Sequence, residues 1–207
     1  MGIQEELRRL RTGPVPGERP DHGVWWFIAK CPGNATHVLQ RCKEVLEVVL
    51  TQLDAERWPT EEEWRSLLPP WFVEECAEEK TAEETERELA RWRALPWTEQ
   101  ARLEKEAEWS LLSWLYWFES GGGEPRYWLW WDALVRDADT LWVGVDQREL
   151  PWGTLDWLLR AAGADGVDQA TLPEFEAILK ALQKETTYGG IYKRPPGRES
   201  RPRGGGP

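Results

Sequence analysis

Apolar side chains recur at every third or fourth position over much of the chain, a spacing that places them on one face of a helix. The longest such pattern begins after Asn34, a residue type that favours helix starts, and ends at about Leu53. Three later starts carry the Thr-x-x-Glu pattern of a capping box, in which two side chains satisfy free backbone N–H groups. We therefore expect five to seven helices, over 34–53, 60–68, 71–79, 81–94, 98–119, 155–162 and 171–185.

Two of these predicted helices differ sharply in their apolar content. The helix over 98–119 is charged in its first part, whereas its last part, 111–118, is apolar nearly all round and should be buried. The helix over 81–94 has only a sparse apolar face, formed by Leu89, Trp92 and Leu95.

Strand patterns appear at two places. The run VWWFIAK at 24–30 is continuously apolar and is followed by a Cys-Pro-Gly turn, which is typical of a strand buried on both faces. The segments 127–135 and 141–146 flank RDADT, a connection of suitable length and composition for a hairpin. The fold class expected is α+β, with strand 24–30 and hairpin 127–146 forming a small, mostly antiparallel sheet packed with helices.

The hairpin contains the best candidate binding site. If Val135 pairs with Leu141, side-chain alternation places one apolar set of residues on one face of the sheet: Leu129, Trp131, Ala133, Val135, Leu141, Val143 and Val145. The opposite face then holds an aromatic shelf beside two carboxylates and the gap at Gly144, namely Trp128, Trp130, Asp132, Trp142 and Asp146. Such a shelf could bind a cation, sugar or base, but the same tryptophans could simply form core under a helix. A one-residue slip in register would exchange the two faces.

The charge of the chain indicates the kind of partner. The formal net charge is −11, which opposes binding to nucleic-acid phosphates. Asp54 to Glu108 contains seventeen acidic residues against eight basic ones, whereas Thr186 to Pro207 contains five basic residues against one acidic residue. We therefore expect a basic protein as partner, with nucleic acid a candidate only for the basic tail.

Composition divides the chain into three parts. Residues 1–23 are rich in Gly and Pro and should form an irregular lead-in. Residues 24–185 should form a single domain, whose core draws on most of the sixteen tryptophans in the chain. Residues 186–207 consist largely of Gly, Pro and Arg, and we expect them to be disordered. Nothing in the sequence sets the oligomeric state.

The cysteine content and hydropathy favour the cytoplasm. Cys31, Cys42 and Cys76 leave an odd thiol over and form no CxxC pair, which is typical of reduced cysteines. The N-terminal residues are too charged for a secretory signal, and no apolar run approaches the roughly 20 residues of a membrane span. The excess of arginine over lysine suggests a GC-rich bacterial genome.

Catalytic and metal-binding motifs are scarce. Cys31, His37 and Cys42 could bring two thiols and an imidazole together near one helix start, where a thiolate would be stabilised. Their spacing does not fit a zinc site, and no P-loop, dinucleotide or serine-hydrolase motif occurs, so we expect no metal or cofactor.

The function expected is that of a non-catalytic intracellular binding protein, whose acidic, tryptophan-rich surface engages another protein. An immunity or inhibitor protein that neutralises a toxin is one concrete form. The alternatives are a small-ligand-binding domain that uses Trp128, Trp130 and Trp142, and an enzyme that uses Cys31 with His37.

Overall fold

The computed structural model of the chain describes residues 2–119, 126, 128–147 and 152–185. Four antiparallel strands form its sheet in the order β2-β3-β1-β4, with β1 at Val24–Lys30, β2 at Trp128–Asp137, β3 at Thr140–Gln147 and β4 at Gly166–Gln169. The α+β class is confirmed, as are the strand at 24–30 and the pairing of Val135 with Leu141. The hairpin turn is tighter than expected, because β2 extends to Asp137 and only two residues separate it from β3.

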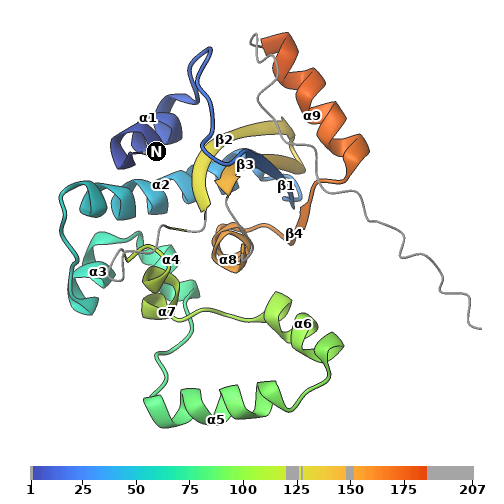
Figure 1. The fold of residues 1–207 in the computed structure, drawn as a ribbon. Helices are drawn as coiled ribbons and strands as arrows, with labels where there is room; N and C mark the ends of the chain where they lie inside the picture. Colours follow the sequence, from blue (N-terminus) through green and yellow to red (C-terminus); the bar gives the residue numbers. More distant parts are fainter. Residues whose placement is uncertain (1, 120–125, 127, 148–151, 186–207) are drawn as a thin grey trace, which may run out of the picture.

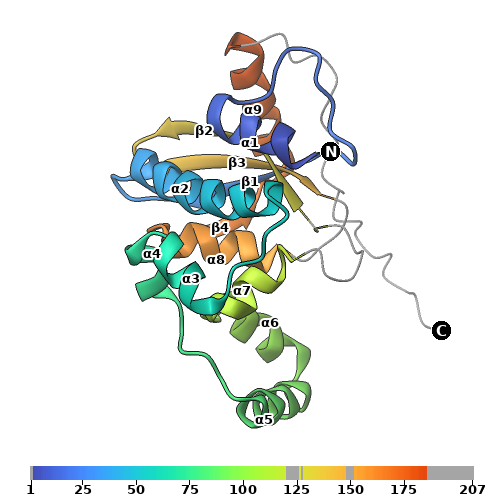
Figure 2. The same ribbon diagram turned by 90° about the vertical axis from the view of Figure 1, so that its left-hand side faces the viewer.

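Helices cover both faces of the sheet (Figures 1 and 2). The larger core lies between one face of the sheet and helices that include α2 (Ala35–Asp54), α7 (Leu111–Tyr116) and α8 (Gly153–Ala161). The smaller core lies on the other face, under α9 (Leu172–Glu185), whose Phe175, Ile178 and Leu182 are buried there. A sheet covered on both faces accounts for the uninterrupted apolar sequence of β1.

Five further helices complete the described part of the chain. They are α1 (Ile3–Thr12), α3 (Glu61–Leu67), α4 (Pro70–Glu75), α5 (Ala82–Arg93) and α6 (Trp97–Glu106). The capping boxes predicted at the starts of α3 and α5 are both present. The described residues therefore contain nine helices where five to seven were expected, and two corrections account for the difference.

The first correction concerns the lead-in over 1–23, which contains the ten-residue helix α1. Leu7 and Leu10 are buried against the body, as is the carboxylate of Glu6, which accepts a hydrogen bond from the backbone N–H of Trp130 at 2.7 Å and pairs with Arg126. The glycines and prolines that follow residue 12 led to the prediction of an irregular segment. The helix α1 precedes them, and the bond from the edge strand β2 to the buried Glu6 carboxylate anchors it to the sheet.

The second correction concerns the single helix predicted over 98–119, which is wrong because α6 and α7 are separate helices. The carboxylate of Glu79 accepts hydrogen bonds from the hydroxyl of Ser110 at 2.8 Å and from the backbone N–H of Leu112 at 2.7 Å, and so satisfies the start of α7. The break lets the apolar segment turn into the core, where Trp114 and Leu115 are fully buried. A long-range contact thus overrides continuous local helix propensity.

Two remaining features complete the comparison. The four-residue strand β4, which pairs with β1, was not predicted, because a strand this short carries little periodicity. The disordered tail predicted over 186–207 lies outside the described residues. Within the described part of the chain, no helix combines the length and the apolar content that a bilayer crossing requires.

Candidate functional site

The aromatic shelf does not form, because a β-bulge interrupts β2. Trp130 pairs with Val145 and Asp132 pairs with Gly144, so two steps along β2 match one step along β3. Trp131 is the extra residue. A bulge shifts the side-chain alternation by one position, so residues before Trp131 point to the faces opposite those predicted.

The bulge separates the three tryptophans expected to share a face. Trp128 and Trp130 join the larger core, whereas Trp142 joins the smaller core beneath α9. Their exposed fractions are 5%, 0% and 3%, so they offer no open platform to a ligand. The expected shared face is therefore wrong, and the structure supports the alternative in which these indoles are packing residues.

Asp146 has a structural environment. Its side chain is almost fully buried and accepts three backbone hydrogen bonds: Oδ2 from Asp21 at 2.7 Å, and Oδ1 from His22 at 2.9 Å and Gly23 at 3.0 Å. Three N–H donors compensate the burial of one carboxylate. Asp146 thus holds the loop that leads into β1.

Asp132, the other carboxylate of the predicted site, is half-buried at the bulge. Its Oδ1 accepts a hydrogen bond from the N–H of Ala133 at 2.8 Å. It lies on the same face as Trp142 and Asp146, so the structure brings three of the five predicted site residues to one face and places Trp128 and Trp130 on the other.

The geometry gives the Cys31–His37 alternative little support. The Cys31 side chain is fully buried, and burial raises the pKa of its thiol to about 11, which keeps it protonated near neutral pH. Burial likewise raises the pKa of Cys42, while His37 lies exposed on the first turn of α2. Among the described residues, no group of three His, Cys, Asp or Glu side chains is arranged to hold a metal ion.

The acidic character of the molecule is concentrated over α3 and α4. From Asp54 to Glu79 the chain has nine acidic residues and two basic ones. Six of these carboxylates are exposed and form no ion pair with any described residue: Asp54, Glu56, Glu62, Glu74, Glu75 and Glu78. We call the surface of residues 54–79 the acidic face.

Exposed apolar side chains gather in the same half of the chain. Among the described residues ten large hydrophobic side chains are exposed, and eight of them lie between residues 58 and 116: Trp58, Leu67, Leu89, Trp92, Trp97, Leu103, Leu112 and Tyr116. Seven of the eight lie on the helices α3, α5, α6 and α7, so this part of the fold carries most of the large apolar side chains that the described residues expose.

The helices α5 and α6 project from the body and form what we call the helical arm, residues 80–107 (Figure 1). No side chain of α5 is buried, and Trp97 at the start of α6 is 76% exposed. Helices in globular proteins normally gain their stability by burying one face, so a helix with no buried face is unusual.

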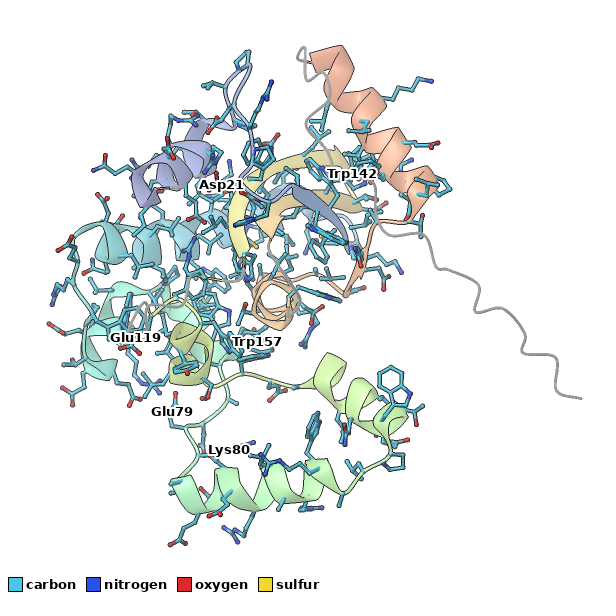
Figure 3. All side chains as sticks on the ribbon, viewed as in Figure 1. Asp21, Glu79, Lys80, Glu119, Trp142 and Trp157 are labelled. Atoms are coloured by element: carbon cyan, nitrogen blue, oxygen red, sulfur yellow. The ribbon has the colours of Figure 1, made fainter. Side chains whose placement is uncertain are left out.

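Contacts at the base of the arm hold its two ends together. The N–H of Ala77 donates to the carbonyl of Trp109 at 3.0 Å, and Glu79 bonds to the start of α7 as described above. On the other side Arg160 of α8 donates to the carbonyl of Ala107 at 2.9 Å. Figure 3 places Glu79 and Lys80 where the chain leaves the body, with Trp157 of α8 nearby. The arm therefore has a fixed base and an uncovered outer part.

The exposed apolar residues of the arm were not among the binding residues predicted from the sequence, although the pattern over 81–94 indicated a weakly packed helix. The predicted helix over 81–94 carried a capping box and only a sparse apolar face, which is typical of a helix that forms by local signals and packs weakly.

Comparison of the chain with protein-family models, curated proteins and solved structures finds no match.

Proposed function

We propose that the protein is a non-catalytic binding protein that engages a basic protein through its acidic, tryptophan-bearing face, residues 54–79. The observation that carries this proposal is the presence of two exposed apolar side chains, Trp58 and Leu67, among the unpaired carboxylates of the acidic face. Apolar anchors supply affinity, whereas unpaired charges select the partner and speed the encounter.

The acidic face suits a cationic partner better than a solvated surface of mixed charge would. Its six exposed carboxylates form no ion pair with any described residue. Their negative potential therefore extends into the solvent and attracts cationic groups on a partner. Trp58, which lies on this face, packs edge-on against the buried Trp64 with 5.2 Å between ring centroids. That contact holds one partly exposed indole in place among the carboxylates, where it could stack on an arginine side chain.

A non-catalytic role also agrees with the state of the thiols. All three cysteines are unpaired, and burial raises the pKa of each. Unpaired thiols favour a reducing compartment, so we expect a cytoplasmic location. An immunity-type inhibitor that covers a basic enzyme would work through the same surface.

The test uses the whole chain and one neutralised variant. Tagged wild-type protein and the triple variant Glu62→Gln, Glu74→Gln, Glu75→Gln are used to capture proteins from a bacterial lysate at several salt concentrations. A captured protein is then purified, and its affinity for both forms is measured by calorimetry. Because an exposed ion pair contributes about 0.2–1 kcal/mol, the triple variant should bind roughly threefold to a hundredfold more weakly.

A matched control removes three exposed carboxylates that lie elsewhere on the surface and form no ion pair with a described residue, through Glu44→Gln, Asp165→Asn and Glu176→Gln. This control should keep the affinity of the wild-type protein. The proposal fails if the captured protein is acidic, if its affinity does not fall as salt rises, or if both triple variants weaken binding equally.

A further inference from the structure

The arm differs from the acidic face in its charge. Residues 80–107 contain seven acidic and six basic residues, so the arm is close to neutral. A basic partner would gain little from this surface electrostatically. The exposed apolar residues of α5 therefore call for an occupant other than the cationic partner proposed for the acidic face.

The α5 helix has a continuous outward row of side chains. Thr85, Leu89 and Trp92 follow the i, i+4, i+7 spacing and so lie one above another on one face. Leu89 is 41% exposed and Trp92 is 37% exposed. Among the described residues no aromatic ring or cation stacks on the Trp92 indole, and no residue of α5 is buried, so this face can accept a second helix.

Charges of both signs lie along α5: Glu83, Glu84, Glu86 and Glu88 with Arg87, Arg91 and Arg93. Glu86 and Arg93 flank the apolar row on one side, and neither forms an ion pair with any described residue, whereas Glu88 on the other side pairs with Lys80. Glu86 and Arg93 are seven residues apart, which is almost two full turns, so they lie on the same flank of the helix about 10 Å apart along its axis.

We propose that α5 pairs with α5 of a second copy of this chain, antiparallel, about a two-fold axis near Leu89 and Ala90. Position 90 lies about halfway between Glu86 and Arg93, so the axis brings Glu86 of each copy opposite Arg93 of the other. In an antiparallel pair of helices like flanks face each other, which puts both ion pairs on one side of the apolar row.

The position of α5 on the arm makes this association compatible with the net charge of −11. Two acidic bodies repel each other, but exposed charges further apart than a Debye length of about 8 Å are largely screened at physiological salt. Contact through the outer, nearly neutral part of each arm keeps the bodies apart (Figure 2). One helix pair buries less area than standard interfaces of about 1,600 Å², so we expect a weak dimer whose population rises with protein concentration.

Charge reversal of the whole chain tests the pairing. Sedimentation equilibrium is measured for Glu86→Arg, for Arg93→Glu, for the double variant, and for an equimolar mixture of the two single variants. Each single reversal places like charges opposite each other twice, so each should self-associate at least roughly tenfold more weakly than wild type. The double variant, and the two single variants when mixed, regain both pairs and should associate within about threefold of wild type.

Matched controls reverse charges on the far side of the same helix, through Glu83→Arg and Arg87→Glu. Both should associate as wild type does. Restored association in the mixture would show that both single variants are folded, because a misfolded variant would not associate with the other one either. The inference is overturned if wild-type protein stays monomeric at millimolar concentration, if the mixture is as weak as the single variants, or if the controls weaken association to the same extent.

Discussion

Replacement of Asp146 by alanine should destabilise the protein more than almost any other removal of a polar side chain. The carboxylate is 1% exposed and accepts hydrogen bonds from the backbone N–H groups of Asp21, His22 and Gly23. A buried donor that loses its acceptor costs about 1–3 kcal/mol. Three such donors, partly relieved by entering water, give a loss of about 3–6 kcal/mol from a total folding free energy of roughly 5–15 kcal/mol.

The variant Asp146→Asn separates charge from hydrogen bonding. Its amide oxygen can still accept the bonds from His22 and Gly23, which share Oδ1, but its NH₂ group faces the N–H of Asp21. One lost bond and one apposed pair of donors predict a loss of about 1–3 kcal/mol, clearly smaller than that of alanine.

Urea denaturation followed by circular dichroism measures both losses. Asp54→Ala serves as control, since this carboxylate is exposed and unpaired among the described residues, and should change stability by no more than about 0.5 kcal/mol. If the free energy of unfolding of Asp146→Ala lies within about 1 kcal/mol of the wild-type value, the carboxylate does not hold the loop that leads into β1. A ligand-binding role for Asp146 would then have to be considered again.

Three further changes test other parts of the structure. Gly144→Ala should cost about 1–3 kcal/mol in urea denaturation, because a Cβ there would approach the Trp26 ring to 3.0 Å; an unchanged midpoint would contradict the packing beneath α9. Burial raises the pKa of Glu18, but the Val15 N–H and two arginines outweigh it and hold this pKa below its ordinary value of 4.5. Ionised Glu18 thus stabilises the fold above that value and loses this effect as pH falls through its lowered pKa. Glu18→Gln should therefore be less stable than wild type at pH 7 by about 1–2 kcal/mol, and this difference should shrink as pH falls through the lowered pKa of Glu18. Cys31 in the native protein should react with iodoacetamide at least roughly a hundredfold more slowly than in urea, since its pKa is raised to about 11; rapid labelling would show that the thiol is accessible.

The elements with strong, continuous periodicity could be predicted from the sequence. The strand at 24–30 and the helix after Asn34 match the structure to within a residue or two. An apolar pattern of that length and period can be buried in only one type of secondary structure. The capping boxes placed two further helix starts correctly, since the bonds they form are local.

The predicted binding site failed through a single inserted residue. The register at Val135 was correct, yet each position before the bulge at Trp131 changed face. Glu6 bonds the N–H of Trp130 beside this bulge, so a helix more than a hundred residues earlier helps to satisfy the irregular edge. Alternation along one strand carries no information about such a distant partner, which is why both readings of the tryptophans were compatible with the sequence.

On the arm, the sequence predicted the helix α5 correctly but did not show that the helix would be exposed. The capping box at Thr81 marks the start of α5, and residues of good helix propensity follow it, so the helix could be predicted. Whether Leu89 and Trp92 would be covered depended on the path of residues 94–110, and the contact of Glu79 with the start of α7 turns that path away from the body. A twelve-residue helix with no buried face is only marginally stable by itself, so cover for its two large apolar side chains would stabilise it. Its exposure therefore marks a surface that another molecule can complete, and the charges beside it indicate which one.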